Sequence, residues 1–159
     1  MKVGDIVIVA DLGEMKVYKA EPRDLEAEAG LKPQNIKLDL VNAIDYVEAH
    51  WKVKDIVTDE AGRFKAPNGT SGGITERHGI EAKMEEDVIR AIAEDIDKMV
   101  AQYNPPKFFL ALPQTIFKRV LDRLSQETKT KLFRFIEEDL TKTDKNQLPE
   151  LFKEKGKHL

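Results

Sequence analysis

The stretch Asp5-Ile6-Val7-Ile8-Val9-Ala10-Asp11 decides the fold of this chain, because its five central residues are apolar and four of them are β-branched. A short apolar run bounded by acids is typical of a strand buried on both faces at the centre of a sheet. A turn-compatible glycine follows, and residues 15–20 favour a second strand, so the two are expected to pair as a hairpin. Residues 35–51 alternate in part between apolar and polar side chains and predict a third, long strand, bulged or broken near residues 42–43. A helix over residues 40–50 is the competing interpretation.

The second half of the chain predicts helices and strands in alternation. Apolar residues recur at helical spacing over residues 81–102, with acids on the opposite face, which predicts an amphipathic helix. A buried strand is expected over residues 107–112, a helix beginning at Pro113, a final strand over residues 132–140 and a short helix around residues 149–152. The whole order, β-β-β-α-β-α-β-α, predicts an α/β fold with a mixed β-sheet and flanking helices, the ribonuclease-H-like order.

The composition limits which class of protein this chain can belong to and in which compartment we expect it. The 159 residues are 41% hydrophobic, enough for one core, so residues 1–159 are expected to form a single domain. Within it we expect a flexible glycine-rich loop at about residues 58–80 and a Lys-rich tail at about residues 153–159. No apolar run is long enough to span a bilayer, and the start lacks the pattern of a secretory signal. The absence of cysteine excludes disulfides, a thiolate nucleophile and a cysteine-ligated zinc. We therefore expect a cytoplasmic protein without a membrane partner.

The net charge of −3 hides an asymmetry between the two parts of the chain. Residues 101–159 hold 12 basic and 8 acidic residues, whereas residues 1–100 hold 14 basic and 21 acidic residues. A basic C-terminal part could face RNA or an acidic partner, although a solvated surface of mixed charge explains the same counts. The balance is not that of a dedicated nucleic-acid-binding domain.

Metal-dependent hydrolysis would need several carboxylates that converge at strand ends. Asp5 and Asp11 flank the first strand, and Asp39 and Asp45 lie on the third. Because 29 of the 159 residues are carboxylates, some cluster by chance, and no spacing among these four selects a ligand set. We therefore expect no metal site and no cofactor.

The glycine-rich loop holds the candidate binding residues. Ser71-Gly72-Gly73 could cradle a phosphate with backbone N–H groups ahead of the following helix, and His78 lies beside Glu76 and Arg77. Neither a Walker pattern nor a Gly-x-Ser-x-Gly turn is present, so no complete catalytic motif supports an enzyme. The candidate binding residues of the loop are Arg63, Lys65, Gly72, Gly73, Arg77 and His78.

Several short segments, in fixed order, carry a resemblance to a known family. They are Ile8-Val9-Ala10-Asp11, the segment of residues 55–63, the helix of residues 81–100, Phe109-Leu110-Ala111-Leu112-Pro113 and Glu138-Asp139-Leu140-Thr141. Over roughly residues 5–152 the chain resembles bacterial host attachment proteins, which are required for attachment to host cells. That family is related to the central domain of archaeal and eukaryotic peptide-chain release factors and of Pelota. The resemblance implies the fold of that domain and a link to the ribosome.

The resemblance does not imply the catalytic step of the release factors. In those proteins the loop before the long helix carries Gly-Gly-Gln, and its glutamine is implicated in releasing the peptide from tRNA. Here the corresponding place reads Ser71-Gly72-Gly73-Ile74, and the side chain of Ile74 has no group that could hold a water by hydrogen bonding.

Three functional hypotheses remain, in this order. The first is a non-catalytic or cryptic translation-associated module that presents the loop to the ribosome or to structured RNA. The second is a protein-interaction domain that binds a protein partner and acts indirectly in attachment to host cells. The third is a metal-dependent hydrolase of nucleic acid.

Overall fold

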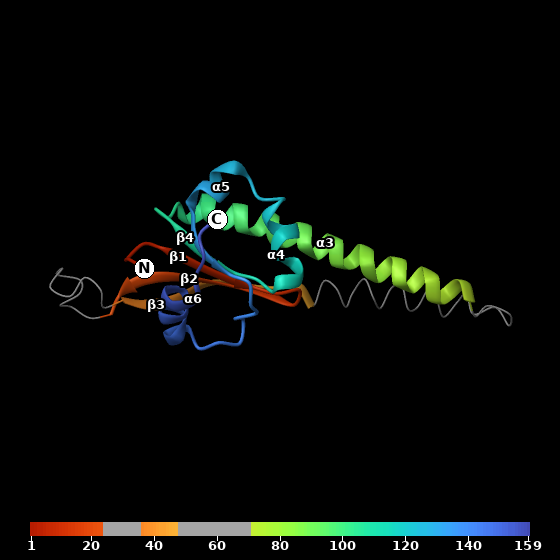
Figure 1. Cartoon of the computed structure of the whole chain (residues 1–159), viewed down its shortest axis with the longest axis horizontal. Coiled ribbons are helices and arrows are strands. Elements are labelled where there is room, and N and C mark those ends of the chain that lie inside the picture. Colours follow the sequence, from red (N-terminus) through yellow and green to blue (C-terminus); the bar gives the residue numbers. More distant parts are fainter. Residues whose placement is uncertain (24–35, 48–70) are drawn as a thin grey trace.

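The computed structural model describes residues 1–23, 36–47 and 71–159, and of residues 71–80 the backbone. A five-stranded mixed sheet forms its centre, and helices cover both faces of that sheet (Figure 1). The elements in chain order are β1 (Ile6–Ala10), β2 (Glu14–Pro22), β3 (Ile36–Asp45), α3 (Ser71–Tyr103), β4 (Phe108–Ala111), α4 (Gln114–Leu121), α5 (Gln126–Lys131), β5 (Leu132–Ile136), the 3-10 helix η1 (Lys145–Gln147) and α6 (Leu148–Lys155). The prediction of a mixed sheet with flanking helices is confirmed.

Strand β1 lies at the centre of the sheet, as its apolar run predicts. The strand order is β3-β2-β1-β4-β5, and β1 pairs antiparallel with β2 and parallel with β4. Successive side chains of a strand point to opposite faces. Ile6 and Ile8 therefore enter one core and Val7 and Val9 the other, and all four are fully buried.

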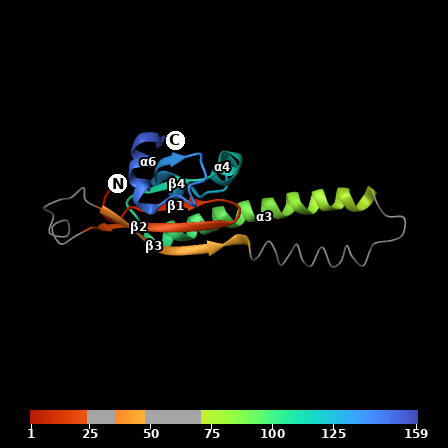
Figure 2. The same cartoon turned by 90° about the horizontal axis from the view of Figure 1, so that it is seen from below.

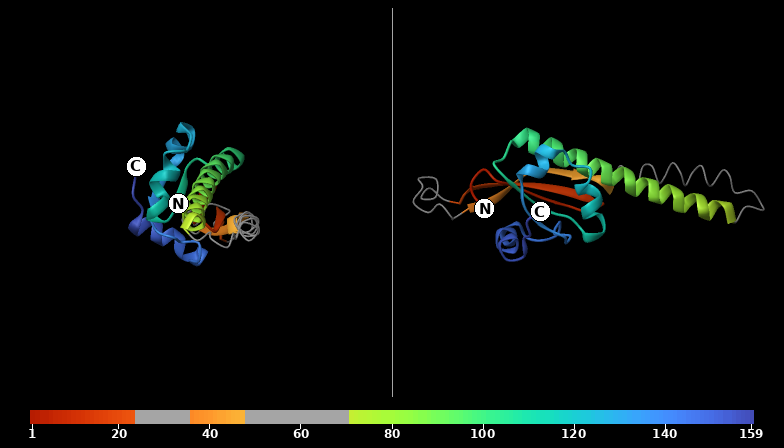
Figure 3. Two further views of the ribbon diagram at one scale, coloured as in Figure 1. Left: turned by 90° about the vertical axis from the view of Figure 1, so that its right-hand side faces the viewer. Right: turned by 45° about the horizontal axis from the view of Figure 1, so that its top comes forward.

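Two separate cores hold the layers together. On one face, α3 and α4 pack through Ile89, Ile92 and Phe117 against the even-numbered residues of β1 and β4. On the other face, Leu148 and Phe152 of α6 pack against the sheet. The right-hand view of Figure 3 shows α3 and α5 on one side of the sheet and α6 on the other. Burial of each of these large apolar side chains contributes about 1.5–3 kcal/mol to the gross stabilisation of the fold.

The third strand is confirmed over residues 36–45, together with its bulge, but residues 46–47, which were expected to continue it, are helical. Strand β3 pairs antiparallel with β2, and the register shifts so that Val17 faces Asn42 while Tyr18 faces Leu40. Val41 is thus the extra residue of a β-bulge, one position from the predicted irregularity. The competing helix is wrong for residues 40–45, because helical backbone begins only at Tyr46.

Helix α3 begins ten residues earlier than the sequence pattern predicts, at Ser71 instead of at residue 81. Its C-terminal end is closed by Asn104, which has a φ of 42°. Asparagine tolerates this left-handed conformation, which often ends a helix. Among the described helices, α3 included, none has the length and apolarity needed to cross a lipid bilayer.

The C-terminal region differs most from expectation. Helix α5 was not predicted, and β5 ends at Ile136, four residues before the predicted end of the final strand. The Lys-rich segment is not a free tail, because α6 extends to Lys155 and Lys157 then forms a β-bridge with Phe135. Two backbone hydrogen bonds of 2.9 Å close this bridge, so the segment lies along the outer edge of β5.

Candidate functional site

The structure places the six predicted binding residues only in part. Arg63 and Lys65 lie outside the described residues. Gly72, Gly73, Arg77 and the adjacent His78 lie on the first ten residues of α3, where the backbone is helical. The expectation that these four belong to a loop is therefore wrong. Two adjacent glycines disfavour a helix by about 1 kcal/mol each, but a helix that is already nucleated gains one hydrogen bond for every residue added. That the six residues bind a ligand stays a prediction.

The N-terminal part of α3 projects from the body of the molecule. The helix has 33 residues, which corresponds to a length of about 50 Å. Among the described residues, the outermost ion pairs between α3 and α4 join Glu85 and Glu86 to Arg119. Residues 71–85, which we call the arm, continue beyond α4 (Figures 1 and 2). The arm is roughly 20 Å long.

An ionic clamp fixes the base of the arm to α4. Glu86 accepts a hydrogen bond of 2.6 Å from Nη2 of Arg119 and a second one from Arg123. These two guanidinium groups lower the pKa of Glu86. Because the clamp joins one residue of α3 to two residues on α4 and just after it, it restricts rotation of the arm about its own axis.

Three side chains meet at the end of the sheet where the parallel strands finish. Asp11 follows β1, and Asp139 and Thr141 follow β5. The Thr141 hydroxyl, fully buried, donates to Oδ1 of Asp139 at 2.6 Å and lies 3.1 Å from Oδ2 of Asp11. Oδ1 of Asp11 accepts hydrogen bonds from the backbone N–H groups of Gly13 at 2.7 Å and Glu14 at 2.8 Å. We call Asp11, Asp139 and Thr141 the carboxylate latch.

The two carboxyl groups of the latch interact so closely that they titrate as a pair. Burial and the hydrogen bond with Asp139 raise the pKa of Asp11. Burial alone would also raise the pKa of Asp139, but hydrogen bonds from Thr141 and from Asp11 outweigh it and lower that pKa. Two ionised carboxylates that contact the same hydroxyl repel each other, so a proton taken up by the pair is held preferentially by Asp11.

Lysine side chains complete the network around the latch. Nζ of Lys16 donates to the carbonyl oxygen of Thr141 at 2.8 Å and lies 3.7 Å from Glu14. Lys142 lies 3.2 Å from the same Glu14 carboxylate. The network therefore ties the segment after β5 to the β1–β2 hairpin. Within the part of the chain that the structure describes, no three His, Asp or Glu side chains are grouped to hold a metal ion.

The sequence analysis found only one member of the latch. Asp5 and Asp11 lie at opposite ends of β1, and Asp39 and Asp45 lie on β3, so the four carboxylates considered there do not converge. Asp139 was not singled out for chemistry. The carboxyl ends of parallel strands lie at one edge of a sheet, and this rule could have paired Asp11 with the acid that follows β5.

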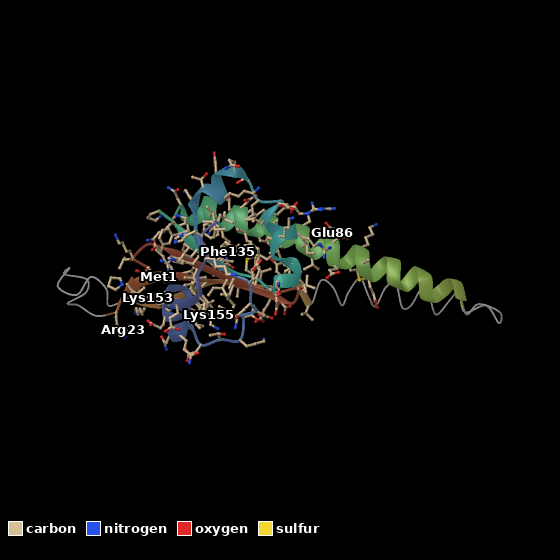
Figure 4. The ribbon with its side chains drawn as sticks, viewed as in Figure 1. Met1, Arg23, Glu86, Phe135, Lys153 and Lys155 are labelled. Atoms are coloured by element: carbon tan, nitrogen blue, oxygen red, sulfur yellow. The ribbon has the colours of Figure 1, made fainter. Side chains whose placement is uncertain are left out.

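Basic side chains gather at the opposite end of the sheet. Lys107 precedes β4 and Lys131 precedes β5, so both lie where the parallel strands begin. Nη1 of Arg134 donates to the carbonyl oxygens of Phe152 at 3.2 Å and Lys153 at 3.1 Å, which brings the end of α6 to the same region. Figure 4 shows Lys153 towards this end and Glu86 towards the arm. We call the surface the basic edge, formed at this end by Lys107, Lys131, Arg134 and Lys153, with Lys157 beside Phe135 towards the other end of β5.

One aromatic ring is exposed within the basic edge. Phe133 is 37% exposed, although it lies on a strand of the sheet. Nζ of Lys107 lies 4.2 Å from the centroid of its ring, and the ring of His158 meets it edge-on at 5.1 Å. A cation over an aromatic face is attracted by the ring quadrupole.

Positive charge at the basic edge is only partly compensated. The buried Asp5 carboxylate lies 3.9 Å from Nζ of Lys107 and accepts a hydrogen bond of 2.7 Å from the backbone N–H of Lys2. Burial, followed by repulsion from Lys107, lowers the pKa of the Met1 amino group. A proton is therefore held less tightly there than on an isolated amine.

Comparison with known proteins gives one finding on the family. A family model described as "Protein required for attachment to host cells" matches residues 6–151. That range spans all five strands of the sheet and reaches into α6. No curated protein matches the chain significantly.

Proposed function

The chain belongs to the family of proteins required for attachment to host cells, and on this premise we propose that it is a non-catalytic translation-associated module that binds the ribosome or structured RNA. Its part in attachment is then indirect, by way of protein synthesis in the cytoplasm. The family description names the process in which such proteins are required and leaves open the molecule that each one binds.

The projecting arm is the observation that carries this proposal. A single helix is about 10–12 Å wide, whereas the body of the molecule is several times wider. Among the described residues the arm is a single helix beyond α4, narrower than the sheet with its covering helices. Gly72 and Gly73 lie at its far end and Arg77 lies along it. The arm carries the cations Arg77 and Lys83 but also Glu76, Glu81 and Glu85, so a contact with phosphates would come from single cations and not from net charge.

The finer fold assignment forms part of the same proposal. The order β3-β2-β1-β4-β5, with three antiparallel strands followed by two parallel ones, is the order expected for a ribonuclease-H-like sheet and for the central domain of release factors. The position of Ile74 on the arm supports a non-catalytic role, because an aliphatic side chain cannot orient a water molecule.

Sedimentation of the full-length chain with ribosomes tests the proposal. The tagged protein is expected to sediment with ribosomes at low salt and to move to the soluble fraction as salt rises, because phosphate contacts weaken with salt. A triple variant, R63E/K65E/R77E, should reduce the bound fraction by about tenfold at low salt.

A charge-matched triple variant serves as the control. K118E/K142E/K145E makes the same change in charge, at three exposed lysines that belong neither to the arm nor to the basic edge. It should keep most of the binding. A wild-type chain that stays wholly soluble at low salt would refute the proposal, as would equal losses in the two variants.

A further inference from the structure

The carboxylate latch and the basic edge lie towards opposite ends of the sheet, although Lys16 and Lys142 lie beside the latch and Asp5 lies beside Lys107. The basic edge lies where β1, β4 and β5 begin, and the carboxylate latch lies where β1 and β5 finish. Glu14 of β2 lies opposite Asp45 of β3 in the sheet and adds a further carboxylate to the end that holds the latch. Five of the 12 basic residues in residues 101–159 belong to the basic edge. A separation of this kind orients an approaching polyanion towards the basic edge.

Phe133 gives the basic edge a second property, an exposed aromatic surface among cations. Its ring meets Phe109 at 5.7 Å, and Phe109 meets the buried Phe152 at 5.4 Å, so the exposed ring is held by a packed aromatic row. Proteins that bind single-stranded nucleic acid combine cations along the backbone with aromatic rings on which bases stack.

We propose that the basic edge binds single-stranded RNA, with Phe133 stacking on a base and Lys107, Lys131 and Lys157 contacting the phosphates on either side. The proposal rests on the proposed function for the class of ligand, but it concerns a surface at the other end of the molecule from the arm. Arg134 has a positioning part, because its guanidinium group holds the carbonyl oxygens at the end of α6.

The exposed ring favours a single strand over other anionic partners. A duplex keeps its base faces stacked inside, so an aromatic side chain on a protein surface gains little from it. An anionic lipid surface would reward cations surrounding a larger apolar group. Among the described residues of β4, β5 and α6, Phe133 is the one large apolar side chain with more than a third of its area exposed, and Val3 and Leu159 are exposed outside these elements.

The experiment measures binding of the purified full-length chain to fluorescein-labelled oligouridine by anisotropy, over a series of salt concentrations. The triple variant K107Q/K131Q/K157Q should bind about tenfold more weakly at low salt, and the slope of log K against log salt should fall by about two. The variant F133L should bind at least about fivefold more weakly, with an unchanged slope. The variant F133Y, which keeps an aromatic ring, should bind like the wild type.

Controls separate a specific surface from general attraction to charge. K118Q/K142Q/K145Q removes the same charge elsewhere, and K142 is 82% exposed at the acidic end, so this variant should keep both affinity and slope. Circular dichroism and thermal unfolding check that each variant is folded, and K131Q/K157Q replaces the triple variant if loss of Lys107 prevents folding.

Four results would overturn the proposal. They are no binding of oligouridine at low salt, equal losses in the two triple variants, equal affinity of wild type and F133L, and binding of phosphatidylglycerol vesicles in place of RNA. Sedimentation with ribosomes is measured separately with the arm variants, so failure of the basic edge and failure of the proposed function are distinguishable.

Discussion

Replacing Asp11 by alanine and by asparagine separates two contributions of the carboxylate latch to stability. The alanine variant removes the acceptor of two backbone N–H groups, at 2.7 and 2.8 Å, and the partner of Asp139. Each lost hydrogen bond costs about 0.5–1.5 kcal/mol, and the site is partly exposed, so D11A should lower the free energy of unfolding by roughly 2 kcal/mol. For a chain of this length that corresponds to a fall of about 4–8 °C in the midpoint of thermal unfolding.

The asparagine variant keeps the hydrogen bonds and removes the titration. Its amide oxygen can accept from both N–H groups, and its NH₂ can donate to Asp139 as the shared proton does. We therefore expect D11N to lose less than about 1 kcal/mol. Because the folded state raises the pKa of Asp11, the wild-type proton stabilises the fold fully below the unfolded pKa. That contribution is lost as the pH rises through the folded pKa. Asp139 has the opposite sign, since its pKa is lowered and its contribution is lost as the pH falls.

Urea unfolding followed by circular dichroism, from about pH 4 to about pH 8, measures both effects. D11N should gain stability relative to the wild type as the pH rises, because only the wild type carries a carboxyl group that must ionise beside Asp139. Parallel pH profiles for the wild type and D11N would refute the shared proton. Equal stability of D11A and D11N would refute the role of the two backbone hydrogen bonds.

Three further predictions concern other parts of the fold. In G156A the new Cβ would clash with the carbonyl oxygen of Phe152, so the free energy of unfolding should fall by about 1–3 kcal/mol, with faster amide exchange at Lys157 than in the wild type. In Y46F the hydrogen bond of 2.6 Å to Asp95 is lost, and urea unfolding should show a free energy of unfolding lower by about 1–2 kcal/mol. The double variant Y46F/D95N should lose less than twice this amount, because both changes remove the same hydrogen bond. Calorimetric titration of the purified chain with Mg²⁺ should show no saturable heat. Stoichiometric binding would support the hypothesis of a metal-dependent hydrolase.

The fold was predictable from sequence wherever a core imposes a pattern. Strand β1 carries apolar residues at every position because two layers cover it, and the second half of α3 carries an apolar stripe because it faces the sheet. The arm carries no such stripe, so the start of α3 was missed. Helix α5 was missed for a similar reason, since its one buried residue is Thr128, which is held by Ser125 and Asp97.

The candidate sites were harder to predict, because they are made by residues that are distant in the sequence. Asp11 and Asp139 meet only once β1 and β5 are placed on either side of β4. The excess of basic residues in the C-terminal part indicates that a basic surface exists but does not say where on the fold it lies. That location depends on the return of the chain to β5 at Lys157.

The bridge between Lys157 and Phe135 also bears on how copies of this chain behave when they are crowded. An open strand edge is a template for uncontrolled pairing between molecules, and natural proteins protect such edges. The last residues of the chain cover part of the β5 edge, whereas β3 relies on the bulge at Val41 and on the charges of Lys37 and Asp39. The segment that forms the bridge therefore also protects this edge from pairing with other molecules, and its removal would expose backbone groups of β5 at Phe135.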